Sequence, residues 1–185
     1  MQPQYTEMKK EETGIVLDYL PNGHPFMDRR TPVAQVLGQQ HFTLLEVAPK
    51  EGVFLSPHEI VYLGPDKREK VHHIIGKIDS HQLTQTAKSE LPYIIEEIVN
   101  KEENKYVEFF NKAGPVTARF HQLELLPGIG KKNMWKIIDE RRVKPFESFE
   151  DIKKRVDLLP DPKKSIIKRI IMEIDQEDKY EFFTR

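Results

Sequence analysis

Residues 123–138 read LELLPGIGKKNMWKII and predict two helices joined by a tight turn. An apolar helical run from Phe120 to Leu126 stops at Pro127-Gly128, because proline interrupts a helix and glycine commonly follows one. A second amphipathic run begins directly after Gly130. The two helices must pack against each other, since neither can bury its apolar stripe alone.

The turn between these helices has the chemistry of an anion-binding site. Gly128 and Gly130 allow φ > 0 and a close approach of another backbone. The first N–H groups of the second helix point outward at the positive end of its dipole, which suits a phosphate oxygen. The dipole disfavours lysines in that first turn, so a pair of them indicates an anionic ligand. The expected contacts are Gly128, Ile129, Gly130, Lys131 and Lys132, with Lys136 as electrostatic support.

Residues 126–130, Leu-Pro-Gly-Ile-Gly, resemble the helix-hairpin-helix motif of non-sequence-specific nucleic-acid-binding proteins. The resemblance implies a grip on backbone phosphates. Met134 departs from the motif, which usually has a small residue there, and this predicts a wider separation of the two helices. The alternative is an ordinary helical hairpin with a glycine C-cap, but a cap needs one glycine and not a pair followed by lysines.

Composition sets broad limits on the class of protein. A chain of 185 residues suggests one or two domains, and 38% hydrophobic with 32% charged residues fits a soluble protein with small cores. The lack of cysteine excludes disulfides, iron–sulfur clusters and thiolate zinc sites. No apolar run approaches the length of a membrane span, and residues 1–13 are too polar for a signal peptide. We therefore expect a cytoplasmic protein that does not bind membranes.

The charge is distributed unevenly along the chain. The formal net charge of −1 argues against coating of nucleic acid by bulk attraction. Residues 115–175 contain fourteen basic and ten acidic residues, a net charge of +4, so the remainder carries −5. Any nucleic-acid binding must therefore come from a local patch, and the C-terminal part is the better place for one.

Residues 14–80 predict a small β-barrel. Short apolar runs at 15–17, 33–37, 42–47, 60–63 and 71–78 are separated by turn residues and lie too close together for intervening helices. About five such strands favour a closed barrel, because closure removes exposed edges. An OB-fold is the first candidate and an SH3-like barrel the alternative.

The barrel loops supply a second set of candidate contacts. In an OB-type barrel, loop cations and surface aromatics such as Phe26 or Tyr62 would hold a nucleic-acid strand by charge and stacking. The other interpretation is that these aromatics are core residues and the charges are merely solvated. The candidate cations are Arg29, Arg30, Lys67 and Arg68.

Residues 81–114 predict a helical bridge. Leu83, Ala87 and Leu91 share one helical face, and Pro92 is expected to open a new helix. A third short helix is expected to end at Gly114-Pro115.

The C-terminal part contains a degenerate repeat of the first hairpin. Its turn, Leu159-Pro160-Asp161-Pro162, has lost both glycines; Asp161 would repel a phosphate and Pro162 lacks an N–H donor. Ser148 is expected to cap the preceding helix, with Asp151 reaching back. The second hairpin is therefore expected to be mainly a scaffold, with outer contacts from Lys163 and Lys164.

The barrel, the hairpin and the segments 90–99 and 108–113 together resemble an uncharacterised archaeal family of predicted nucleic-acid-binding OB-fold proteins. The resemblance implies an α+β protein with an OB-like barrel followed by an all-α tandem helix-hairpin-helix domain. It also implies RNA rather than DNA as the partner, with proteins of the transcription or translation machinery as further candidates. The expected division is a tail (1–13), the barrel (14–80), the bridge (81–114), the tandem domain (115–176) and a second tail (177–185).

Two alternatives remain beside a non-enzymatic nucleic-acid binder. Base-excision glycosylases with this motif have a catalytic lysine at the position of Lys132 and an aspartate near Glu150 and Asp151, but those acids have a structural role in a helix first turn here. A protein-docking module is the other alternative. We expect no enzyme activity, no cofactor and no metal; His72 and His73, for example, point to opposite faces of a strand.

Overall fold

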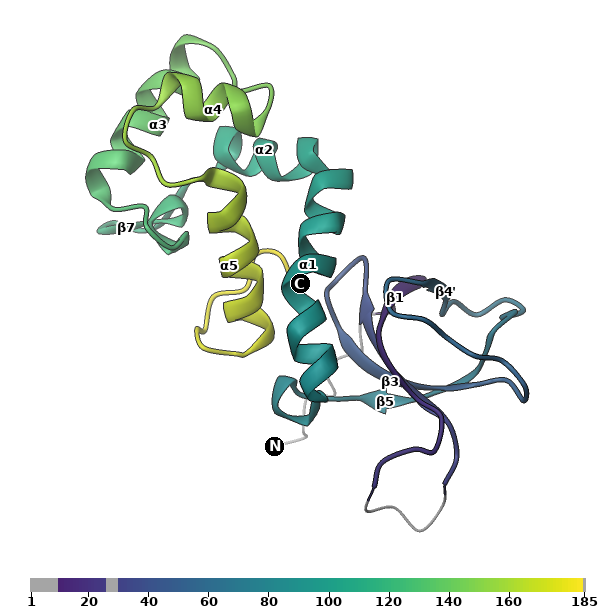
Figure 1. Ribbon diagram of the computed structural model, residues 1–185. Coiled ribbons are helices and arrows are strands. Elements are labelled where there is room, and N and C mark those ends of the chain that lie inside the picture. Colours follow the sequence, from purple (N-terminus) through teal and green to yellow (C-terminus); the bar gives the residue numbers. More distant parts are fainter. Residues whose placement is uncertain (1–9, 26–29, 185) are drawn as a thin grey trace, which may run out of the picture. The chain divides into compact units, whose positions relative to one another are not determined.

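The structure is a computed structural model that describes residues 10–25 and 30–184 (Figure 1). The chain divides into two compact units. The first contains the residues through Ile94 together with those from Glu173 onward, and the second is Ile95–Met172. The first unit is therefore assembled from both ends of the chain.

The first unit contains a curled five-stranded antiparallel sheet, a half-barrel (Figure 1). Its spatial order is β4-β1-β2-β3-β5, so the first four strands have the 4-1-2-3 order of a Greek key and β5 pairs with β3. The five strands are close to the five apolar runs expected from the sequence: β1 (Thr13–Leu20), β2 (Val33–Gly38), β3 (Leu44–Pro49), β4 (Ile60–Tyr62) and β5 (Val71–Lys77).

The expectation of a closed barrel is wrong for the described residues. Strands β4 and β5 lie at opposite ends of the sheet order and do not pair with each other. Strand β4 has only three residues, and the N–H groups of Leu63 and Gly64 that follow it both donate to the carbonyl of Glu12, at 2.7 and 3.2 Å. This segment thus pairs with the chain just before β1, and its hydrogen bonds are not available to β5.

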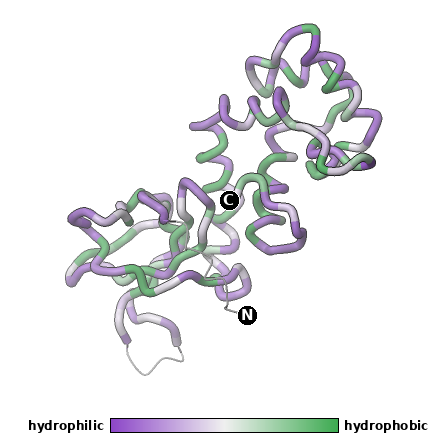
Figure 2. The backbone as a smooth tube through the Cα atoms, turned by 180° about the vertical axis from the view of Figure 1, so that it is seen from behind, coloured by the Kyte–Doolittle hydropathy of each residue, from purple (hydrophilic) through white to green (hydrophobic). Residues whose placement is uncertain are grey.

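Alternate strand residues, such as Val16, Ala34, Val36, Leu45 and Val47, contribute to the hydrophobic core of the sheet. Figure 2 shows green, hydrophobic stretches along the chain of this unit. Strand β2 is buried along its whole length, because both of its faces are covered. There the fully buried amide of Gln35 donates to Gln82 O at 3.0 Å and accepts from Thr84 N at 2.8 Å. These bonds connect β2 to the 3₁₀ turn η1 (Ser80–Gln82) and the start of α1 (Gln85–Lys101).

The expectation that Pro92 opens a new helix is also wrong. Helix α1 continues through Pro92 without a break. The proline ring is exposed, while Leu91, Ile94 and Ile95 beside it are buried. Packing on both sides of the proline therefore outweighs the loss of one helical hydrogen bond.

The second unit is mostly helical, but its first hairpin differs from the expectation. A two-stranded ribbon and a single 3₁₀ turn replace the α-helix expected from Phe120 to Leu126. Pairing of β7 with β6 holds Phe120 extended, and the following turn is capped at His121. The elements are α2 (Glu103–Lys112), β6 (Pro115–Thr117), β7 (Phe120–His121), η2 (Gln122–Leu125), α3 (Lys131–Val143), α4 (Phe149–Arg155) and α5 (Pro162–Ile174).

The expected cap of α4 is confirmed. The hydroxyl of Ser148 accepts from Asp151 N at 3.0 Å, and the Asp151 carboxylate reaches back to accept from Glu147 N at 3.1 Å. Both bonds satisfy backbone donors at a helix start that would otherwise have none.

Candidate functional site

The turn between η2 and α3 has the backbone that its two glycines predict. Gly128 has φ of +85°, which side chains other than glycine rarely tolerate, and Ile129 N donates to Leu126 O at 3.0 Å to close the turn. The Ile129 side chain is buried, so it fixes the turn to the hydrophobic core. Gly130 is extended and is the N-cap of α3, whose first residue is Lys131.

The first amide groups of α3 are open. In the described part of the chain, no hydrogen-bond acceptor meets the N–H groups of Lys131, Lys132 and Asn133, and Gly130 has no side chain that could cap them. Gly128, Gly130 and both lysines are exposed. Neither lysine forms an ion pair with any described residue. An anion at this helix start would meet backbone donors and two cations together.

The start of α5 is the corresponding position in the second hairpin, and it is closed. The carboxylate of Asp161 accepts from Lys164 N at 3.2 Å and forms an ion pair with Lys153 at 3.3 Å. Partial burial is the largest single influence on the pKa of Asp161 and raises it, but these contacts together lower the pKa below its ordinary value. Among the described residues, the protein thus supplies an anion at the start of α5 and none at the start of α3.

The second hairpin supports the turn of the first. A Cβ on Gly128 would lie 3.0 Å from Pro160 Cγ. The Ser165 hydroxyl donates to Pro127 O at 2.9 Å, and the buried Arg169 guanidinium donates to Leu125 O at 3.4 Å. Sequence reasoning missed Ser165 and Arg169. Their spacing of four residues, among the buried isoleucines of α5, is the signal that could have revealed them.

The other lysines expected at this site differ in their availability. Lys136 is half-buried and donates to Asp157 O at 3.4 Å. Lys163 pairs with Glu96 at 2.9 Å and donates to Asn100 Oδ1 at 3.3 Å, so it serves an internal contact and is poorly placed as an outer contact. Lys164 is exposed. The open set is therefore the turn 128–130 with Lys131, Lys132 and Lys164.

The loop candidates of the half-barrel do not form a comparable cluster. Arg29 and Phe26 lie outside the described residues, while Arg30 and Lys67 are exposed. The guanidinium of Arg68 donates to Gly64 O at 2.9 Å within its own loop. The Tyr62 hydroxyl likewise donates to Asp66 at 3.3 Å, so the ring is part of the loop structure.

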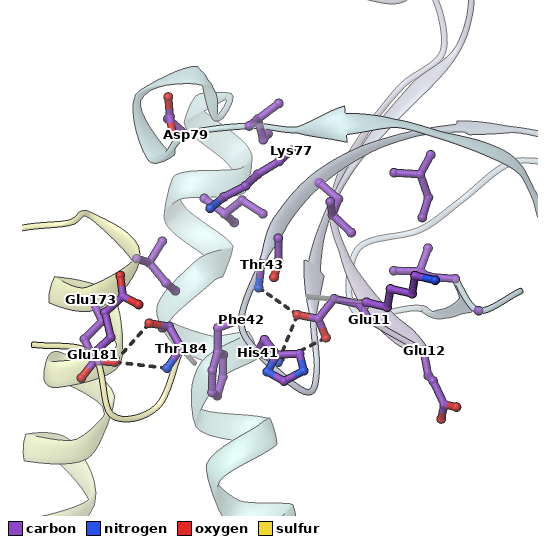
Figure 3. A pocket seen from close by; sticks show the side chains of 18 of the residues that line it. Glu11, Glu12, His41, Phe42, Thr43, Lys77, Asp79, Glu173, Glu181 and Thr184 are labelled. Carbon is purple, nitrogen blue, oxygen red and sulfur yellow. Dashed lines mark hydrogen bonds between the residues drawn. The ribbon is translucent and has the colours of Figure 1, made fainter. Parts of the chain in front are cut away.

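A cavity of about 910 Å³ in the first unit was not expected from the sequence (Figure 3). Two buried carboxylates line it, and both are satisfied by backbone donors. Glu11 accepts from the amides of Gln40, His41 and Thr43, and Glu173 accepts from those of residues 182–184. The other lining charges are balanced and select no ligand by sign: Lys10, Arg68 and Lys77 against Glu12, Asp79 and Glu181.

The remaining alternatives find little geometric support. Asp151 pairs with Arg155 at 3.1 Å, and within the described residues neither Asp151 nor Glu150 forms an ion pair with Lys132. Nowhere in residues 10–25 and 30–184 do three histidine or carboxylate side chains meet as a metal site would require. No described helix combines the length and apolar character needed to span a membrane.

The fold and the turn define a mixed α+β protein in which a curled half-barrel accompanies a helical unit with an open, lysine-flanked turn. The chain belongs to the family described as "Protein of unknown function (DUF655)", which matches residues 10–185. It is 46% identical over 179 residues to the uncharacterized protein MJ0038 of Methanocaldococcus jannaschii, covering 96% of this chain and 81% of that protein. The crystal structure of Af1531 from Archaeoglobus fulgidus, of the same family, is similar with a TM-score of 0.88 and 48% identity, covering 95% of this chain and 100% of that one. The expected resemblance to an uncharacterised archaeal family is confirmed.

Proposed function

We propose that this protein binds nucleic acid without enzymatic activity, through the turn 128–130 and the first residues of α3. The observation that carries the proposal is the contrast between two helix starts in one unit. Asp161 fills the start of α5, whereas the start of α3 has unmet N–H groups beside Lys131 and Lys132. A backbone phosphate supplies the acceptor oxygens and the negative charge that this position lacks.

Such a site provides affinity without a choice of sequence. The amides and lysines contact phosphate oxygens, which are the same for every base. RNA is the expected ligand on the family resemblance. Contacts to the 2′-hydroxyl are what would distinguish RNA from DNA. The half-barrel, as an OB-like module, would hold single-stranded or structured segments through exposed loop cations such as Arg30 and Lys67.

The test is the salt dependence of binding. We expect Lys131→Glu with Lys132→Glu to weaken binding to all sequences alike and to lower the slope of log K against log salt by roughly two. The measurement is fluorescence anisotropy of a labelled RNA over a series of salt concentrations.

The matched control is Lys101→Glu with Lys154→Glu, which changes the net charge equally at two exposed lysines that belong neither to the turn nor to α3. If the two double variants have the same slope, charge in general and not this turn governs binding. A partner that binds the protein with no dependence on salt would instead support a docking module.

A further inference from the structure

Trp135 lies on the exposed face of α3, and 55% of its side chain is accessible. The core side of the same helix is formed by Met134, Ile137 and Ile138, which are buried. The hydrophobic core therefore does not require a tryptophan at this position. A single exposed hydrophobic residue is ordinary by itself, so its surroundings decide what it can do.

Those surroundings are basic. Trp135 follows Lys132 by three residues and Lys131 by four, so its ring shares one helical surface with both lysines. The distance from Lys131 along the helix axis is about 6 Å. The nearest acid one turn further on, Asp139, is paired with Arg142 at 3.6 Å. Along α3 the ring thus adjoins two cations, and the carboxylate one turn further on is paired with an arginine.

We propose that Trp135 stacks on an unpaired base, so that the ligand of this face is single-stranded or looped nucleic acid. This inference rests on the proposed function and narrows the class of nucleic acid that the protein binds. The positive charge of the lysines favours a polyanion such as nucleic acid. The exposed tryptophan ring favours unpaired bases, because the bases of a duplex are already stacked on one another and are not free to stack on a side chain that approaches from the phosphate backbone. Every base has such a face, so the contact adds preference for strand state and none for sequence.

The experiment uses the intrinsic fluorescence of Trp135, which is the only tryptophan of the chain. The full-length protein is titrated with a short oligouridine and with a blunt-ended RNA duplex, and binding of each labelled RNA is followed separately by anisotropy. We expect the single strand to quench the tryptophan and the duplex to leave its emission unchanged.

Variants separate stacking from folding. Trp135→Ala is expected to weaken single-strand binding roughly 5- to 150-fold and to leave duplex binding unchanged, while Trp135→Phe keeps most of the single-strand affinity. Val143→Ala removes another exposed apolar side chain of α3, 84% accessible, and is expected to have no effect.

The outcomes distinguish the two proposals. One outcome would overturn the stacking inference and leave the proposed function intact. In it, anisotropy shows binding that is lost on Lys131→Glu with Lys132→Glu, but the tryptophan emission does not change and Trp135→Ala binds the single strand with wild-type affinity. Equal quenching by the duplex would also overturn it. Absence of binding to either RNA would remove both proposals.

Discussion

Gly128 carries two independent constraints. Its φ of +85° lies in the left-handed region, where a residue with a side chain loses about 1–2 kcal/mol. In addition, a Cβ would lie 3.0 Å from Pro160 Cγ, closer than ordinary van der Waals contact. Gly130 differs on both counts, because its φ is −89° and a Cβ there meets no atom within 4 Å.

We therefore expect Gly128→Ala to lower the free energy of unfolding by about 1–2 kcal/mol. Gly130→Ala is expected to change it by less than about 0.5 kcal/mol, since a weaker N-cap is offset by a less flexible unfolded chain. Urea denaturation of the two variants makes the comparison. Equal losses would show that the backbone of Gly128 is not the reason for its glycine.

The 3₁₀ turn η2 depends on a neutral histidine. His121 Nδ1 accepts from Leu123 N at 3.1 Å, and Glu124 reaches back to accept from His121 N at 2.9 Å. Burial lowers the pKa of His121 from 6.5, and the positive charge of Arg141 lowers it further against the smaller opposing effect of Glu124. A protonated ring cannot accept at Nδ1, so protonation and capping exclude each other.

This predicts a pH dependence of stability with a definite sign. The folded state holds the His121 proton less tightly than the unfolded state, so the contribution is complete above the unfolded pKa and is lost as the pH falls through about 6.5 toward the lower folded value. We expect His121→Asn, which retains a capping oxygen but does not titrate, to lose less stability than the wild type between about pH 7 and pH 5. The measurement is urea denaturation of both proteins at a series of pH values. The other histidines are common to both proteins, so they do not affect the comparison. Parallel curves of stability against pH would contradict the capping role of His121.

The first unit combines chain segments that are far apart in sequence, and buried carboxylates fasten them. Glu173, at the end of α5, is 2% exposed and accepts backbone N–H groups from residues 182, 183 and 184 at 2.9–3.1 Å. These bonds hold the backbone of the C-terminal segment. Glu11 does the same for the loop between β2 and β3.

Glu173→Ala should therefore free the C-terminal segment. We expect a loss of about 1.5–3 kcal/mol, the range for hydrogen bonds to a charged group, and faster cleavage after Tyr180 or Phe182 in limited proteolysis. Glu177→Ala, which alters an exposed acid of the same segment, is the control. Cleavage at the same rate in both variants would mean that other contacts hold the segment.

Several local features could be predicted because their signals are local. The alternation of apolar residues and turn residues located the five strands to within a few residues, and Ser148 marked the start of α4. The failures share one cause. Each was inferred from neighbours in sequence but decided by contacts that the local sequence does not show. Hydrogen bonds to Glu12 after β4 left the barrel open, and burial of Leu91 and Ile94 kept the helix continuous at Pro92. Pairing of β7 with β6 kept Phe120 out of a helix.

The sequence by itself determined the turn at Gly128, the start of α3 and the two lysines beside it, because backbone freedom and helix capping act within a few residues. Only the tertiary structure decided which donors and cations stay available. In the folded chain Lys163 pairs with Glu96, and Asp161 accepts a hydrogen bond at the start of α5. Ser165 and Arg169 donate to backbone carbonyls just before the turn. Hydrogen bonding and burial join residues that are distant along the chain, so no short stretch of sequence can specify them.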